Sequence, residues 1–305
     1  MNTTMKTATI TDYGTPDALE IREVPLPVPD HNEALIAVIA STINPVDVKT
    51  RKPGTIQTIP HFPATLGWDL AGIVVSAPTG SPVSAGDRVI AMHPPEANGT
   101  GCWSQYVTIP VERLAPAPTS VDLQTAATLP LAGLTASQAL QRLAPQPDER
   151  LLITGAVGAV GGMAVQLATA AGHTATGLVS RESQIPSALA LGAQDALVGT
   201  TRDPAGEFDA VLDTAGILNP ALLRPGGRLV TVSDEEIPEE LTRKARSADH
   251  NYVGHDPAGL ARLVNLVDDS TLQLRVAAAF PLDHIADAHR TMEAGGLNGK
   301  VVVTM

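Results

Sequence analysis

The chain has 305 residues, of which 44% are hydrophobic and 17% charged, and this composition is typical of a folded protein large enough for two domains. Its formal charge of −12 argues against nucleic acid or an anionic membrane surface as the main partner. Cys102 is the only cysteine, so an intrachain disulfide is excluded. The sequence shows neither an apolar signal-peptide region nor a run of membrane-spanning length, and we therefore expect a cytoplasmic protein.

The first half of the sequence is predicted to be rich in β-strands. Short apolar or alternating runs are separated by clusters of Pro and Gly, as in VPLPVPDH and APTGSPVSAGD. The predicted strands are 35–40, 71–76, 87–92 and 106–109. Two helices are expected next, near 121–129 and 132–143, and Ser120 or Asp122 is a suitable cap for the first.

Residues 151–172 carry a strand–turn–helix pattern that is typical of dinucleotide binding. The apolar run 151–153 predicts a buried strand, and Ala156-x-Gly158-x-x-Gly161 then opens a segment of helix formers. Small residues let the backbone approach a pyrophosphate, which the N–H groups and dipole of a helix N-terminus can hold. The candidate cofactor-binding residues of this turn are Ala156, Val157, Gly158, Ala159 and Val160.

The end of the next predicted strand, 174–179, indicates which cofactor binds. An NAD site usually places Asp or Glu there, whereas this strand ends in Ser180 and Arg181. A guanidinium is suited to a bidentate contact with a 2′-phosphate, so the sequence favours NADPH over NADH. The alternative is a solvated loop arginine that pairs with Glu182.

Strands and helices alternate through the rest of the chain. The expected strands are 208–213, 228–232 and 300–304, and the expected helices are 186–191, 257–268 and 282–294. Such alternation predicts an α/β fold with a doubly wound parallel sheet. We expect a Rossmann NADPH-binding domain at 122–268, inserted between the two parts of a β-rich domain at 1–121 and 269–305.

Nine short motifs follow one another in the order of a known superfamily. They are INPVDVKTR, FPATLGWDLAG, AGDRV, GCWSQYV, TLPLAGLTA, GAVGAVGG, FDAVLDTAG, RPGGRLV and NGKVVV. On these motifs the chain resembles the medium-chain dehydrogenases/reductases over its whole length, and specifically their zinc-independent quinone oxidoreductase branch. The resemblance implies that the β-rich domain is a GroES-like catalytic domain.

The departures from the zinc enzymes of that superfamily concern the metal. Those enzymes place Cys at the position of Asn44 and His-Glu at the positions of Trp68 and Asp69. With one cysteine and no Cys/His ligand set, this chain is expected to bind no zinc. Without such a Lewis acid, the resemblance implies an acceptor that is already electrophilic, either a quinone or an α,β-unsaturated carbonyl.

The candidate catalytic residues are Asn44, Asp47 and Lys49, which belong to the active-site segment of the resembling family. The resemblance implies that Asn44 meets the nicotinamide ribose or a substrate oxygen. Lys49 would donate a hydrogen bond to that ribose or to an oxygen that gains enolate charge. Asp47 would orient Lys49 or Arg51. The alternative is that Asp47 caps a turn and both cations are solvated.

The resemblance also implies cofactor contacts outside the glycine turn. The candidates are Thr135, Ala215, Gly216, Val232 and Lys300. A hydroxyl that bonds back to its own helix is the alternative for Thr135. A salt bridge between the domains is the alternative for Lys300.

The sequence as a whole predicts an NADPH-dependent, zinc-independent reductase of small quinones or enones. Trp103 is expected beside the substrate cleft, where an aromatic wall would suit a quinone, and His93 is expected at the surface. A homodimer is usual in the resembling family. Two alternatives stay open, an NADPH-binding structural or redox-sensing protein without substantial turnover and a pathway-specific enoyl or enone reductase.

Overall fold

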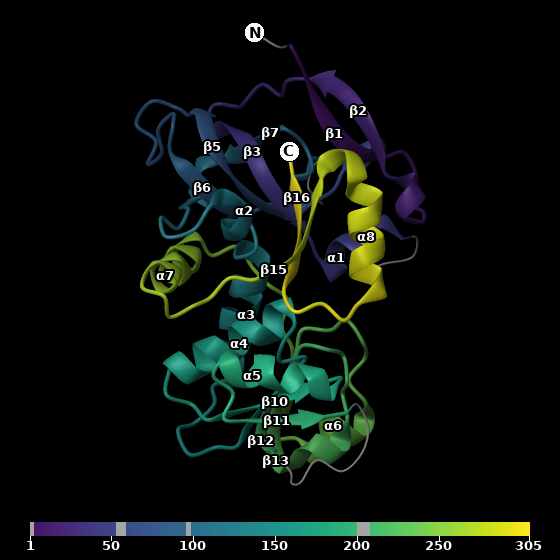
Figure 1. The fold of residues 1–305 in the computed structure, drawn as a ribbon, viewed down its shortest axis with the longest axis vertical. Helices are drawn as coiled ribbons and strands as arrows, with labels where there is room; N and C mark the ends of the chain where they lie inside the picture. The colour runs from purple at the N-terminus through teal and green to yellow at the C-terminus, as the bar shows by residue number, and fades with distance from the viewer. Residues whose placement is uncertain (1–2, 53–58, 96–98, 200–207) are drawn as a thin grey trace. The chain divides into compact units, whose positions relative to one another are not determined.

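The computed structural model describes residues 3–52, 59–95, 99–199 and 208–305 (Figure 1). The chain divides into two compact units. The first contains Met1–Leu131, His255–Asp269 and Leu274–Met305, and the second contains Ala132–Gly254 and Ser270–Gln273. These bounds differ from the predicted Rossmann domain at 122–268, because residues 122–131 and helix α7 (Pro257–Asp268) belong to the first unit.

The first unit is built mainly from strands. Its strands are β1 Thr4–Ile10, β2 Glu20–Pro25, β3 Glu33–Ile43, β4 Ala64–Thr65, β5 Asp69–Ser76, β6 Arg88–Met92, β7 Tyr106–Pro110, β8 Ala115–Pro116, β15 Val276–Pro281 and β16 Lys300–Thr304. Its helices besides α7 are α1 Pro45–Arg51, α2 Leu123–Ala126 and α8 Ile285–Ala294, and α3 Pro130–Leu143 begins here and continues into the second unit. Asp122 caps α2 by accepting from the Thr125 amide at 2.7 Å, as the sequence predicts.

The larger sheet of the first unit contains strands from both the N-terminal and the C-terminal parts of the sequence. Among the described residues its strand order is β15-β16-β3-β5-β6-β8, with β7 also paired to β3, while β2-β1-β4 form a smaller sheet. Figure 1 shows the C-terminal β16, in yellow, beside the N-terminal β3. The two strands are antiparallel, with Val301 opposite Ile43. Lys300 therefore begins β16 next to the end of β3, where Asn44 follows.

The second unit alternates strands and helices. Its strands are β9 Leu151–Thr154, β10 Ala175–Val179, β11 Asp195–Val198, β12 Phe208–Asp213, β13 Leu223–Thr231 and β14 Ser247–His250, and its helices besides α3 are α4 Ala159–Ala170, α5 Ile185–Ala190 and α6 Glu239–Lys244. The strands are all parallel, in the order β11-β10-β9-β12-β13-β14. Every residue of β9 and β12 is buried, as expected for central strands covered on both faces. The predicted doubly wound Rossmann fold is confirmed.

None of the described helices is long and apolar enough to cross a lipid bilayer.

Candidate active site

Asn44 lies where β3 ends and α1 begins, and it is the N-cap residue of that helix. Pro45 takes the first helical position, which needs no N–H donor. The Asp47 side chain reaches back, and its Oδ2 accepts from the Asn44 backbone N at 2.8 Å and from Asn44 Nδ2 at 3.1 Å. Both residues are buried, at 1% and 0% exposure. Asp47 thus closes a capping box, which agrees with the alternative interpretation that it caps a turn.

Asp69, the first residue of β5, is the acceptor around which the cluster forms. Its Oδ2 accepts from Asn44 Nδ2 at 2.9 Å and from the Thr42 hydroxyl at 2.5 Å. Its Oδ1 accepts from the Leu131 backbone N at 2.7 Å. Asp69 is fully buried. The sequence indicates position 69 only as one where the zinc enzymes carry a metal ligand, and it does not predict these hydrogen bonds of Asp69.

Lys300 completes the cluster from β16. Its ammonium donates to Asn44 Oδ1 and, at 3.0 Å, to Asp69 Oδ2, and the side chain is 4% exposed. Both partners belong to the same unit as Lys300, so the ion pair does not link the two units. The Asn44 amide is therefore held at both ends, because its nitrogen faces two carboxylates and its oxygen faces the ammonium.

The cluster of Asn44, Asp47, Asp69 and Lys300 contains two carboxyl groups and one ammonium. Lys300 donates to Asp69, whereas the hydrogen bonds that the Asp47 carboxyl accepts within the described part of the chain come from the neutral Asn44. Burial raises the pKa of Asp47 from 3.8 to about 7; hydrogen bonds from Asn44 lower it, Asp69 raises it further and Lys300 lowers it. Its Oδ1 is buried without a hydrogen-bond partner among the described residues. The Asp47 carboxyl group therefore titrates with a pKa near neutral pH.

The two cations of α1 do not share one environment. Arg51 is fully buried, and its guanidinium donates to Glu293 at 2.7 Å and to the Gly14 carbonyl at 2.9 Å. The interpretations that Arg51 is solvated or oriented by Asp47 are therefore wrong. Lys49 is half-buried on the same helix.

Two further expectations for the first unit are wrong. Trp103 is fully buried in a hydrophobic cluster; its indole N–H donates to the Thr42 carbonyl at 3.2 Å, and its ring packs edge-on against His289. It is a core residue and not an exposed aromatic wall. His93 is only 4% exposed, and burial, with Arg113 and His255 nearby, lowers its pKa to about 4. It is a neutral buried imidazole and not a surface histidine.

The predicted pyrophosphate turn opens α4 in the second unit. Gly158 is the N-cap residue, and the first turn carries no acidic side chain that would compete with a phosphate. Gly158, Ala159 and Val160 are half-buried, whereas Ala156 and Val157 are buried and contribute to the core. At Gly161 a Cβ would lie 2.2 Å from the Gly155 carbonyl oxygen, so only glycine lets α4 pack against this turn.

The ends of three parallel strands are tied together by Asp213. Its carboxylate accepts from the hydroxyls of Thr154 at 2.6 Å and Thr231 at 2.9 Å, which lie at the ends of β9 and β13. The backbone N of Ile217 donates to the same carboxylate at 3.1 Å. The sequence identifies Asp213 only as a strand end; an acidic residue at the end of a largely apolar strand was the signal for this role. The predicted cofactor residues Ala215, Gly216 and Val232 directly follow these strand ends, at the edge where ligands of such sheets bind.

The remaining predicted cofactor residues lie elsewhere in the second unit. Ser180 and Arg181 are exposed directly after β10, and Ser180 donates through its N and Oγ to Gln184 at 3.2 and 3.0 Å. Thr135 is 6% exposed on α3.

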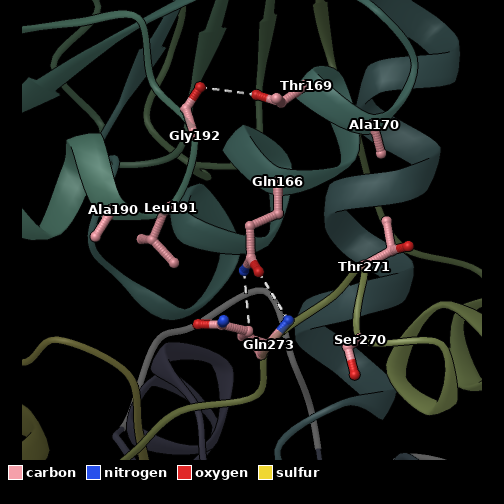
Figure 2. Close-up of a pocket in the computed structure, with 9 residues that line it drawn as sticks. All are labelled: Gln166, Thr169, Ala170, Ala190, Leu191, Gly192, Ser270, Thr271 and Gln273. Carbon is pink, nitrogen blue, oxygen red and sulfur yellow. Dashed lines mark hydrogen bonds between the residues drawn. The ribbon is translucent and has the colours of Figure 1, made fainter.

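A surface pocket of about 240 Å³ in the second unit contains none of the predicted site residues (Figure 2). It is lined by Gln166, Thr169, Ala170, Ala190, Leu191, Gly192, Ser270, Thr271 and Gln273. Its lining carries no charged side chain, and Gln166 is already bonded to the backbone of Gln273 and Gly162. We therefore assign it no part in the reaction.

Comparison with known proteins agrees with this geometry. Residues 30–119 match the alcohol dehydrogenase GroES-like domain, and residues 191–303 match the zinc-binding dehydrogenase domain. These two domains, with a parallel Rossmann sheet, define a medium-chain dehydrogenase/reductase, an oxidoreductase class that uses a nicotinamide cofactor and small-molecule substrates.

Similar individual proteins narrow the assignment. The 2-methylene-furan-3-one reductase of Solanum lycopersicum is 29% identical, covering 98% of this chain and 79% of its own length. The chloroplastic NADPH-dependent alkenal/one oxidoreductase of Arabidopsis thaliana is 28% identical with the same coverage. The solved quinone oxidoreductase of Coxiella burnetii has a TM-score of 0.91 at 27% identity, covering 99% of both chains. The chain belongs to the zinc-independent quinone oxidoreductase branch of the superfamily.

The name of the matched domain implies zinc, but the residues present do not fit it. Among the described residues, no group of three or more His, Cys, Asp or Glu side chains is placed to hold a metal ion. In the cluster around Asn44, the ammonium of Lys300 already contacts Asp69 and the Asn44 amide oxygen. Amide and carboxylate oxygens beside a lysine ammonium are a poor donor set for zinc, which prefers Cys and His in protein sites.

Proposed function

We propose that this protein is an NADPH-dependent reductase of quinones or α,β-unsaturated carbonyls. The observation that carries the proposal is the buried cluster of Asn44, Asp69 and Lys300, which offers hydrogen-bonding groups and no zinc ligand set. A site of this chemistry cannot polarise a simple ketone through a metal, so it suits an acceptor that is already electrophilic. The names of the reductases from tomato and Arabidopsis and of the Coxiella oxidoreductase support the same substrate classes.

NADPH fits the residues of the second unit. Gly158, Ala159 and Val160 would hold its pyrophosphate at the N-terminus of α4, where the helix carries no acidic side chain in its first turn. Ser180 and Arg181, which are both exposed directly after β10, would hold the 2′-phosphate, for which a guanidinium is a suitable bidentate partner. Thr135, Ala215, Gly216 and Val232 would line the remaining groove. When bound, the reduced nicotinamide supplies the hydride.

The first unit would receive the acceptor. Lys49 is the polar residue proposed to face the acceptor oxygen, which gains negative charge as the hydride arrives. Fixed hydrogen-bond donors at such an oxygen stabilise the transition state more than the ground state. Lys49 or solvent then provides the proton that completes the reduction. Asn44 donates both amide hydrogens to Asp47 and Asp69, so its Oδ1, which also accepts from Lys300, is the atom proposed to accept from a hydroxyl of the nicotinamide ribose.

The test follows nicotinamide absorbance while purified protein is mixed with NADPH and a panel of small quinones and enones. We expect saturable oxidation of NADPH with at least one acceptor class, and the Asn44→Ala variant should reduce kcat/KM at least tenfold. Saturable NADPH binding without oxidation across the whole panel would overturn the proposal in favour of a structural or redox-sensing protein. Turnover of a single enone with no quinone activity would instead indicate a pathway-specific enone reductase.

A homodimer and a cytoplasmic location complete the proposal. Among the residues that the structure describes, strand β14 is an edge strand of the parallel sheet, and Tyr252 shortly after it is 64% exposed. An open sheet edge beside an exposed aromatic side chain suits pairing with a second copy of the chain. Light scattering on the eluting protein should give twice the monomer mass.

A further inference from the structure

The strongest unexplained feature of the first unit is the buried ion pair between Lys300 and Asp69. The Lys300 ammonium lies 3.0 Å from Asp69 Oδ2, and the two side chains are 4% and 0% exposed. Removing two charges from water costs several kcal/mol for each ion, so a pair of this kind is weak support for stability. The family resemblance implies a cofactor-binding role for Lys300, yet its ammonium donates to Asn44 and Asp69, which both belong to the cluster around Asn44.

The contacts show what the pair does to Asn44. An amide has two ends that are similar in size and opposite in hydrogen-bonding character, so its orientation is set only by its neighbours. Here Asn44 Nδ2 donates to Asp69 at 2.9 Å and to Asp47 at 3.1 Å, while Oδ1 accepts from Lys300. Turning the amide over would place its nitrogen against an ammonium and its oxygen against two carboxyl groups.

We propose that Lys300 and Asp69 are positioning residues that fix the orientation of the Asn44 amide. The inference rests on the proposed function in one respect, namely that Asn44 acts on the bound acceptor or cofactor. The ammonium of Lys300 is the positive charge that balances Asp69 in this cluster. Its position is set by the sheet, since Val301 pairs with Ile43 and Lys300 therefore lies beside Asn44.

The test is a double-mutant cycle that combines Lys300→Met with Asn44→Ala. Methionine keeps most of the length of the side chain and removes the charge and the donor. Lys300→Met should lower kcat/KM at least tenfold in the wild-type background, chiefly through kcat. In the Asn44→Ala background the same substitution should change kcat/KM less than twofold, because the residue through which it acts is gone.

The chain offers a matched control in Lys6, whose ammonium lies 2.9 Å from Asp283 in the same unit with both side chains about half exposed. Lys6→Met should leave kcat/KM within twofold of wild type. If Lys300→Met does not fold, Lys300→Leu, which also removes the charge and the donor, replaces it in the cycle. Equal effects of the Lys300 substitution in both backgrounds would overturn the inference.

The same four proteins, unfolded by urea, separate the inference from the proposed function. Each substitution lowers the folding equilibrium constant by some factor. The product of the two factors for the single substitutions should be at least tenfold larger than the factor for the double substitution, because both single substitutions remove the same contact. If wild-type protein turns over no acceptor, the proposed function fails and this unfolding cycle decides the inference. Additive unfolding effects would then refute it.

Discussion

Replacing Asp47 by Asn should abolish a loss of stability that the wild-type protein shows as pH rises. Burial raises the pKa of Asp47 to about 7 in the folded protein, against 3.8 for the ordinary side chain. At a pH between these two pKa values, the Asp47 carboxyl has lost its proton in the unfolded chain and still holds it in the folded chain. The unfolded state then binds fewer protons, so the free energy of unfolding decreases as pH rises from about 4 to about 7.

The size of the effect follows from the two pKa values. A difference of about three pKa units corresponds to about 4 kcal/mol, of which about 2–3 kcal/mol develops between pH 5 and pH 8. An Asn at position 47 resembles the protonated acid. Its carbonyl oxygen can accept the two hydrogen bonds that Asp47 Oδ2 receives from Asn44, and its amide nitrogen takes the place of the unpartnered Oδ1.

The assay is urea unfolding of wild type and Asp47→Asn at pH 5, 6, 7 and 8. The stability of the variant relative to wild type should increase by about 2–3 kcal/mol across this range, whatever constant offset the substitution brings. Asp283→Asn, at a half-exposed aspartate, is the control and should show no comparable trend. A pH-independent difference between Asp47→Asn and wild type would refute the reasoning, because Asp47 would then be ionised in the folded protein.

Three further predictions concern the cofactor and the metal. Gly158→Val adds a branched side chain at the N-cap of α4, where even a Cβ would lie 3.2 Å from the Gly155 carbonyl oxygen. NADPH affinity, measured by fluorescence titration, should therefore fall at least tenfold, or about 1.4 kcal/mol. Unchanged affinity would place the cofactor elsewhere. Arg181→Ala should weaken NADPH binding by about ten- to a hundredfold through loss of a charge-assisted contact and leave NADH nearly unchanged; an unaltered ratio between the two cofactors would remove the support for NADPH. Elemental analysis after dialysis should find substoichiometric zinc, and EDTA should leave turnover intact, whereas one zinc per chain required for activity would contradict the assigned role of Lys300.

The parts of the fold that the sequence predicted are those with a strong local pattern. The strand 208–213 is apolar except for Asp209 and Asp213 and is buried throughout in the structure. Helix 257–268 is preceded by Asp256, which caps it by accepting from the Gly259 amide at 2.7 Å. Elements with mixed polarity were not predicted. Strand β2 reads EIREVP and is half to fully exposed, so it carries no clear alternation, and α1 is only seven residues long with two basic side chains. Short or exposed elements are stabilised by their neighbours, which a local pattern does not contain.

The candidate site shows the same division between local and distant information. The family resemblance identified Asn44 and Asp47, because both lie in the motif INPVDVKTR, and in the structure they form a local capping box. It did not predict that Lys300 binds Asn44 and Asp69. Lys300 lies 256 residues from Asn44 and 231 residues from Asp69 along the chain. Those contacts exist because β16 pairs with β3 and because β3 pairs with β5. A lysine near the end of the chain is by composition an ordinary surface residue, and only the register of three strands turns it into the cation of a buried cluster.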